Sequence, residues 1–115
     1  MARGRKKVNI MPITSGASDY VSLESGNIQR FKGAKMYLYI VVDTDDAVRI
    51  EVKAYDSTGD AFYGSRWFEF TTSELDAYTG SGSGEFAPFK NVCEQAVKDA
   101  LEGISENTGN TFTIV

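Results

Sequence analysis

The chain has 115 residues, of which 42% are hydrophobic and 24% are charged, values that fit one soluble globular domain and exclude a disordered chain. It contains no histidine and one cysteine, Cys93, which excludes an internal disulfide framework and a zinc site built from several thiolates. Its longest apolar run, residues 36–42, is too short to cross a bilayer, and no hydrophobic stretch follows the basic start as in a signal peptide. We therefore expect a cytoplasmic or virion protein with no membrane partner.

The net charge of −4 is unevenly distributed along the chain. Basic residues near the start contribute +4, so the remaining residues carry −8. These basic residues are Arg3, Arg5, Lys6 and Lys7. A basic terminus on an acidic body is typical of a tail that contacts a polyanion, although such tails also serve only to keep a protein soluble. We predict a basic N-terminal arm at residues 1–7, with RNA or single-stranded DNA as its partner, and one α+β domain at residues 8–115.

The first elements predicted along the chain are two short strands that form a hairpin. Val8, Ile10 and Ile13 indicate a short first strand, and Pro12 favours an edge position or a strand end because proline cannot donate to a neighbouring strand. Residues 20–24 follow a turn-rich segment and place Val21 and Leu23 on one side, which we expect to be buried.

Residues 35–70 carry the clearest structural signal, which is that of three antiparallel strands. Residues 36–42 are apolar on both sides, which favours a central strand, and residues 48–55 alternate apolar and polar side chains as a half-buried strand does. The third strand, residues 61–70, contains Gly64, where we expect a β-bulge. Turns rich in Asp, Ser and Gly separate the strands and are predicted at residues 43–46 and 56–60.

A short helical turn and a glycine-rich segment are predicted after the third strand. Thr71 and Glu74 have the spacing of a capping box, which predicts a turn of helix at residues 73–78. Residues 79–85 are rich in glycine and serine, so they form either a crossover connection or a mobile loop. Their glycines lack the spacing of a phosphate-binding loop.

Residues 88–104 form the one long predicted helix, because apolar residues recur there every three or four positions. Gly103 provides a stop. On the polar side, Glu94 and Lys98 stand one turn apart in the order that favours an ion pair. Residues 111–115 alternate like a short final strand, which joins an edge of this sheet or of a neighbouring molecule's sheet.

One amphipathic helix packed on a twisted antiparallel sheet covers one face and leaves the other uncovered. The face predicted under the helix is formed by Leu38, Ile40, Val48, Ile50, Val52, Phe68 and Phe70. The opposite side, which we name the aromatic face, is defined by Tyr37, Tyr39, Tyr55 and Trp67. Arg49, Glu51 and Lys53 lie between these rings. Aromatic side chains gathered on a surface usually mark a contact site, so these four residues are the candidate interface.

Three roles compete for the aromatic face. It contacts a second copy of the chain, giving a dimer or a larger shell, since Tyr, Trp and Arg are enriched at the centres of interfaces. It binds single-stranded nucleic acid, with bases stacked on the rings and phosphates neutralised by Arg49, Lys53 and the basic arm, although Glu51 and Glu69 oppose this. Or the N-terminal hairpin covers it and leaves no site.

An enzymatic function is not predicted, and no cofactor or metal is expected. Cys93 lies on the apolar side of the helix, and a chain without histidine offers no imidazole base to activate it. The aspartates at residues 43–46 lack the glycine and distant glutamate of a calcium-binding loop, and turn formation explains them. The sequence therefore predicts a structural or binding protein.

The order of elements, an N-terminal hairpin, a meander at residues 35–70 and a helix near the C-terminus, resembles that of the coat proteins of single-stranded RNA phages. This resemblance implies dimers that share a sheet, with helices on the outer face and RNA on the inner face. Residues 36–101 are also similar in outline to the strand-strand-strand-helix repeat of PUR-like single-strand binders. We predict a non-enzymatic, self-assembling structural subunit, a coat or capsid-associated protein of a virus or phage, whose basic arm contacts nucleic acid. The alternative is a single-stranded nucleic-acid-binding protein that uses the aromatic face.

Overall fold

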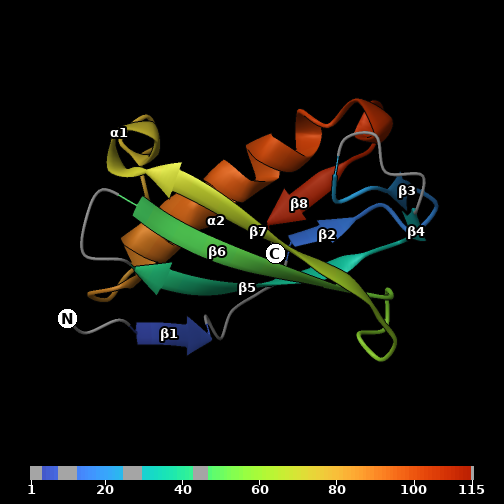
Figure 1. Cartoon of the computed structure of the whole chain (residues 1–115), viewed down its shortest axis with the longest axis horizontal. Helices are drawn as coiled ribbons and strands as arrows, with labels where there is room; N and C mark the ends of the chain where they lie inside the picture. Colours follow the sequence, from blue (N-terminus) through green and yellow to red (C-terminus); the bar gives the residue numbers. More distant parts are fainter. Residues whose placement is uncertain (1–3, 8–12, 25–29, 43–46, 115) are drawn as a thin grey trace.

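The computed structural model describes residues 4–7, 13–24, 30–42 and 47–114 (Figure 1). It contains an antiparallel sheet with one long helix packed on it, which confirms the predicted α+β class. The elements are β1 (Gly4–Lys7), β2 (Ile13–Ser15), β3 (Tyr20–Val21), β4 (Phe31–Lys32), β5 (Lys35–Val42), β6 (Ala47–Tyr55), β7 (Phe62–Thr71), α1 (Thr72–Leu75), α2 (Ala87–Glu102), η1 (Ser105–Asn107) and β8 (Phe112–Ile114). Within these described ranges, no helix has the length and apolar character needed to span a membrane.

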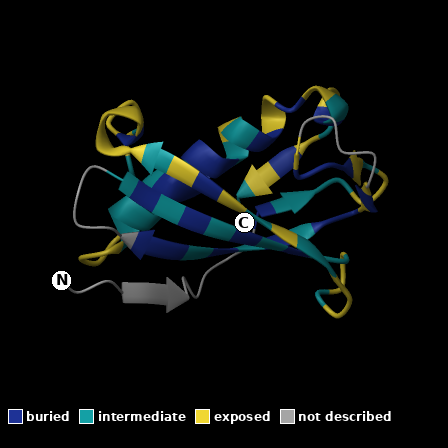
Figure 2. Ribbon diagram, viewed as in Figure 1, coloured by how far each residue is buried: buried dark blue, intermediate teal, exposed yellow. Residues whose placement is uncertain are grey.

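The strands β5, β6 and β7 form the predicted meander. Every second residue of β6 from Val48 to Ala54 is buried, because alternate side chains of a strand point to opposite faces of the sheet. Figure 2 shows this alternation as dark blue and teal bands along β6. The expected bulge is also present: Ala54 pairs with Gly64 but Tyr55 pairs with Phe62, so Tyr63 is the extra residue in β7.

The predicted N-terminal hairpin is replaced by longer-range pairing. β2 pairs with β5 and with β8, which gives the strand order β7-β6-β5-β2-β8, and β1 pairs with β5. β3 pairs instead with β4 in a second, two-stranded sheet. The hairpin does not form because Ile13 of β2 is fully buried between its two neighbouring strands. In addition, Gly33, which has a φ of 63°, bends the chain between β4 and β5. The final strand therefore joins this molecule's own sheet.

Parts of four predicted features lie outside the described residues. They are residues 1–3 of the basic arm, residues 8–12 of the first strand, the aspartate-rich turn at residues 43–46 and residue 115 of the final strand. The second turn, residues 56–60, is present and contains Gly59 at a φ of 85°. There the Asp56 carboxylate accepts hydrogen bonds from the Thr58 hydroxyl (2.8 Å) and the Asp60 N–H (2.9 Å), which lower the pKa of Asp56.

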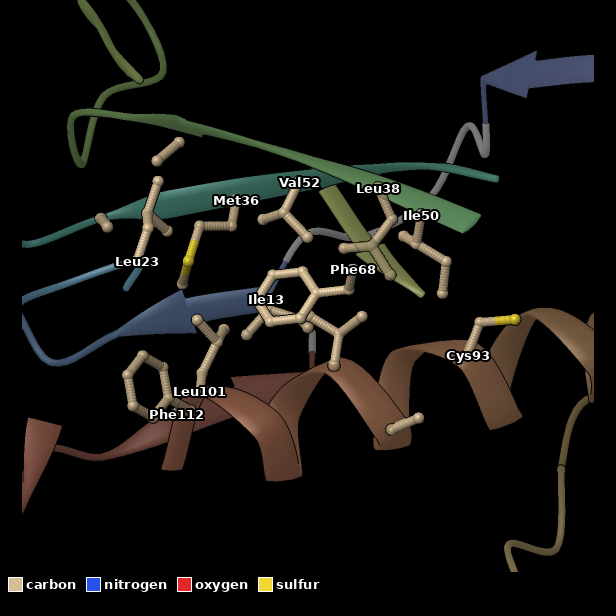
Figure 3. Packing of buried hydrophobic residues seen from close by; sticks show 14 of the residues in the cluster. Ile13, Leu23, Met36, Leu38, Ile50, Val52, Phe68, Cys93, Leu101 and Phe112 are labelled. Carbon is tan, nitrogen blue, oxygen red and sulfur yellow. The ribbon is translucent and has the colours of Figure 1, made fainter. Parts of the chain in front are cut away.

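The helix α2 packs on one face of the sheet and closes the hydrophobic core (Figure 3). It spans Ala87–Glu102, close to the predicted residues 88–104, and ends at Gly103, whose N–H donates to the Asp99 carbonyl at 2.9 Å. Cys93 is fully buried on its apolar side, as predicted. The sheet face predicted under the helix is buried at Leu38, Ile40, Val48, Ile50, Val52 and Phe68, and Phe70 is partly buried against the same core.

The prediction that Glu94 lies on the solvent-exposed side of α2 is wrong. This residue is 3% exposed, and Lys98 forms its ion pair with Glu102 at 2.9 Å rather than with Glu94. The physical reason is that the glycine-serine segment, residues 79–85, folds back onto α2: the Ser81 N–H donates to the Asn91 side-chain oxygen at 3.1 Å. Asn91 and Gln95 on this side of α2 therefore bond to the glycine-serine segment, whereas Asp99 and Glu102 stay exposed.

The capping box predicted at the start of α1 is confirmed. The Thr71 hydroxyl accepts from the Glu74 N–H at 3.1 Å, and the Thr71 N–H donates to the Glu74 carboxylate at 2.8 Å. Leu75 is buried, so this single turn of helix is fixed both by its cap and by contact with the core.

Candidate functional site

The register of the meander gathers the predicted aromatic residues on the side of the sheet that faces away from α2. Tyr39 pairs with Glu51, which pairs with Trp67, and Tyr37 pairs with Lys53 in the next row. Directly paired residues of antiparallel strands point to the same face. These positions alternate with the buried residues of β5 and β6, so they lie on the aromatic face.

Two of the predicted rings contact each other across the strands, and one of them contacts a further ring, that of Phe62. Tyr37 and Tyr55 meet edge to face with centroids 5.7 Å apart, and Tyr55 meets Phe62 at 5.4 Å. The three tyrosines are half-buried, whereas Trp67 is 41% exposed and Phe62 is 56% exposed. Tyr37, Tyr55 and Phe62 are thus packed in sequence, and the most exposed rings of the face, Trp67 and Phe62, both lie on β7.

Phe62 was missed by the sequence pattern, and the bulge explains why. In a regular strand, Phe62 points to the same side as Phe68, which is the helix-covered side. The extra residue Tyr63 reverses this alternation. Tyr63 then stacks on Phe31 of the core at 4.9 Å, and Phe62 joins Tyr55 on the aromatic face. Gly64 was the only available signal, since it marked the bulge but not its direction.

Cationic side chains predicted for nucleic-acid contact lie over the rings of this face. The Lys53 Nζ is 4.8 Å from the centroid of the Tyr39 ring, and the Arg49 guanidinium is 5.8 Å from that of Trp67. A cation held over a ring is attracted by the negative charge of the ring face. Arg49 also pairs in register with Glu69, so the face carries both signs of charge.

Part of the predicted basic arm is a strand of the sheet rather than a free tail. In β1, Arg5 pairs with Val41 and Lys7 pairs with Tyr39, while Lys6 pairs with Ile40. β2 pairs only with the start of β5, so β1 satisfies backbone groups farther along β5. Arg3 lies outside the described residues. The backbone at Lys7 thus lies beside a residue of the aromatic face.

A groove of about 350 Å³ lies at β8 and α2, on a different part of the molecule. It is lined by Tyr78, Gln95, Lys98, Asp99, Phe112, Thr113 and Ile114. The Tyr78 hydroxyl donates to Asp99 at 2.7 Å, which raises the pKa of Tyr78, and Lys98 is paired with Glu102. Both charged residues of the groove are thus bonded within the chain, and the aromatic face is the stronger candidate site.

Cys93 is fully buried, and burial raises the pKa of its thiol to about 12, which disfavours the nucleophilic thiolate. In the part of the chain that the structure describes, no three His, Cys, Asp or Glu side chains are grouped as metal ligands.

The comparisons with known proteins gave no match: no family model, no curated protein and no solved structure is similar to this chain.

Proposed function

We propose that this protein is a non-enzymatic structural subunit that associates with copies of itself through the aromatic face and the adjoining strand β7. The observation that carries the proposal is the position of the exposed rings. Trp67 and Phe62 are large apolar side chains that stay exposed although the chain has a closed core, and both lie on one strand of the aromatic face. Exposed apolar surface of this kind is typical of interaction sites.

The charges of the face support a second copy as the partner. Arg49 and Lys53 are interleaved with Glu51 and Glu69 in the register of the meander. In a two-fold dimer each surface meets itself after a rotation, so a surface with both signs of charge can place cations opposite anions. A polyanion, in contrast, is repelled by Glu51 and Glu69.

In its most specific form, the proposed subunit belongs to the coat or capsid of a viral or phage particle, with its basic residues against packaged nucleic acid. Two of the three elements behind the resemblance to phage coat proteins support this form, namely the meander and the helix near the C-terminus, whereas the N-terminal hairpin is absent. The four basic residues in the first seven positions support it through charge.

The test is the mass of the protein in solution over a range of concentrations, measured by light scattering after size exclusion. We expect the wild-type mass to exceed that of one chain, and Trp67→Ala or Tyr39→Glu to shift it towards the monomer. Tyr20→Ala is the matched control, because Tyr20 is 53% exposed but lies on β3 in the two-stranded sheet. A monomeric wild type, or variants with wild-type mass, would contradict the proposal.

The second candidate function is single-strand nucleic-acid binding on the same face. It is favoured by Lys53 over Tyr39 and Arg49 over Trp67, because bases stack on rings while nearby cations neutralise phosphates. A fluorescently labelled random oligonucleotide distinguishes the two. Under this function Trp67→Ala weakens oligonucleotide binding and leaves the mass of the free protein unchanged, whereas under self-association it lowers the mass.

A further inference from the structure

The strand β7 is both the longest strand of the sheet and one of its edges. It has 10 residues and pairs with β6 on one side. No other strand in the described part of the chain pairs with its outer side. The outer edge of a long strand carries backbone N–H and C=O groups that are available to another strand, and natural proteins usually shorten, charge or cover such edges. Here the edge carries the exposed rings of Trp67 and Phe62.

We propose that two copies of this chain pair antiparallel through β7, around a two-fold axis centred on Trp67, so that their aromatic faces join into one continuous face. This inference rests on the self-association proposed above and specifies the part of it that β7 makes, in which the two aromatic faces lie side by side. A two-fold axis perpendicular to the sheet keeps the aromatic faces of both copies on the same side, because paired residues of antiparallel strands share a face.

The charges on β7 restrict where the axis lies. A centre at Arg66 places two guanidinium groups opposite each other, and a centre at Glu69 places two carboxylates opposite each other. Like charges in directly opposed positions destabilise a strand pair. A centre at Trp67 avoids both, since Ser65 then faces Glu69 of the second copy and Arg66 faces Phe68 of the second copy.

The length of the overlap favours Trp67 over the remaining centres. With the axis at Trp67, residues 63–71 of both copies pair, whereas a centre at Phe68 pairs only residues 65–71 and a centre at Ser65 pairs only residues 62–68. The Trp67 centre also brings the two indole rings together. Each indole ring already lies 5.8 Å from an Arg49 guanidinium, so the pair has two neighbouring indole rings at its axis with one guanidinium beside each.

Disulfide trapping with the double variant Ser65→Cys/Glu69→Cys tests this register while keeping Trp67. In the proposed pair, the new thiol at position 65 of each copy lies opposite the new thiol at position 69 of the other, within the roughly 4.5–5.5 Å between Cα atoms of paired residues. The two positions of one chain are about 13 Å apart along the strand, so a disulfide within the chain cannot form. The native Cys93 is not expected to form a disulfide, because it is fully buried.

Under mild oxidation we expect most of the double variant to run at twice the monomer mass on a non-reducing gel. Each single variant, Ser65→Cys or Glu69→Cys, should remain largely uncrosslinked, because its thiol meets the same thiol of a second copy only in a pair centred on that position. Crosslinking confined to the double variant supports the proposal. Crosslinking of a single variant, or no crosslinking by a protein that light scattering shows to be oligomeric, overturns this register while self-association stands. A wild type that is monomeric at every concentration overturns both.

Discussion

Asn107 is a buried polar residue that joins distant parts of the chain. Its side-chain oxygen accepts from the Ser22 N–H at 2.7 Å, and its amide group donates to the carbonyls of Ser22 at 2.8 Å and Leu101 at 2.9 Å. The side chain is 2% exposed, and its partners on Ser22 are 85 positions away in the sequence. One amide thus ties the segment after β3 to the end of α2, and these three bonds are buried.

We expect Asn107→Ala to lower the free energy of unfolding by about 3 kcal/mol, since it leaves several buried backbone groups without their partner. Urea denaturation monitored by circular dichroism measures this. Asn110→Ala is the control, because Asn110 donates to the Tyr20 carbonyl (2.7 Å) in an exposed position, and its loss should cost about 1 kcal/mol or less. Equal losses for the two variants would contradict the role assigned to Asn107.

Glu94 carries a carboxyl group in a buried position of α2. Burial raises its pKa above the ordinary value of 4.5, an effect that is partly opposed by the Asn91 amide, which donates to it at 3.4 Å, and by the charge of Lys90. The folded state therefore favours the protonated carboxyl more than the unfolded state does. This preference stabilises the fold fully below pH 4.5 and is lost as the pH rises through the raised pKa.

Glu94→Gln should therefore be more stable than the wild type at pH 7, and this advantage should shrink or vanish at about pH 4, where the carboxyl of the wild type is protonated as well. The amide keeps an oxygen that accepts from Asn91 but carries no charge to bury. Urea unfolding at the two pH values measures the difference. Glu85→Gln, at an exposed glutamate, should show no such dependence on pH. A Glu94→Gln variant that is less stable than the wild type at pH 7 would refute this explanation.

Among the elements, the glycine-serine segment at residues 79–85 packs on α2 and is hydrogen-bonded to it. The Ser81 hydroxyl donates to the Asn91 side-chain oxygen at 3.2 Å, and the Gln95 amide donates to the Thr79 carbonyl at 2.9 Å. A Cβ added at Gly80 would clash with the backbone of Pro88. Glycine is thus needed at this position because two stretches of backbone approach closely, and the composition alone does not distinguish this from a mobile loop.

Gly80→Ala should lower the free energy of unfolding by about 2 kcal/mol, because the new methyl group meets backbone atoms that have no alternative rotamer. Thermal denaturation followed by far-ultraviolet circular dichroism tests this. Ser83→Ala adds no atom to this contact and is exposed, so it should leave the melting temperature nearly unchanged. A Gly80→Ala variant as stable as the wild type would show that the segment does not pack on α2 in solution.

At the scale of the whole molecule, positive charge is concentrated at one end of an acidic chain, and part of it belongs to the sheet. Because β1 is a strand paired with β5, deleting the arm removes backbone hydrogen bonds together with charge. Replacing the basic side chains of the arm with neutral ones removes the charge but keeps the backbone hydrogen bonds of β1. The proposed contact with a polyanion predicts that these charges release counterions on binding.

The triple variant Arg5→Gln/Lys6→Gln/Lys7→Gln should flatten the dependence of oligonucleotide affinity on salt, with the slope of log K against log salt falling in magnitude by about 2 for a single strand. Fluorescence anisotropy at several salt concentrations measures the slope. Lys90→Gln/Lys98→Gln on α2, the helix on the other side of the sheet, should leave the slope close to that of the wild type. An unchanged slope in the triple variant would remove the arm from nucleic-acid contact.

Elements whose signal is local can be predicted from the sequence. The alternation through β6, the three- and four-residue spacing of α2 and the capping box from Thr71 to Glu74 each follow from residues near one another in the chain. The same alternation placed Tyr37, Tyr39, Tyr55 and Trp67 on one face, because β5, β6 and β7 follow one another closely in the chain and pair in that order.

Features that depend on partners far away in the sequence could not be predicted and are known from the folded chain. These include the pairing of β2 with β5 and β8, the burial of Glu94, and the bonds of Asn107 to Ser22. The direction of the bulge, which turns Phe62 onto the aromatic face, belongs to the same group. A short strand offers the same backbone donors and acceptors to any neighbour, so its partner is selected by how the whole core packs and not by its own residues.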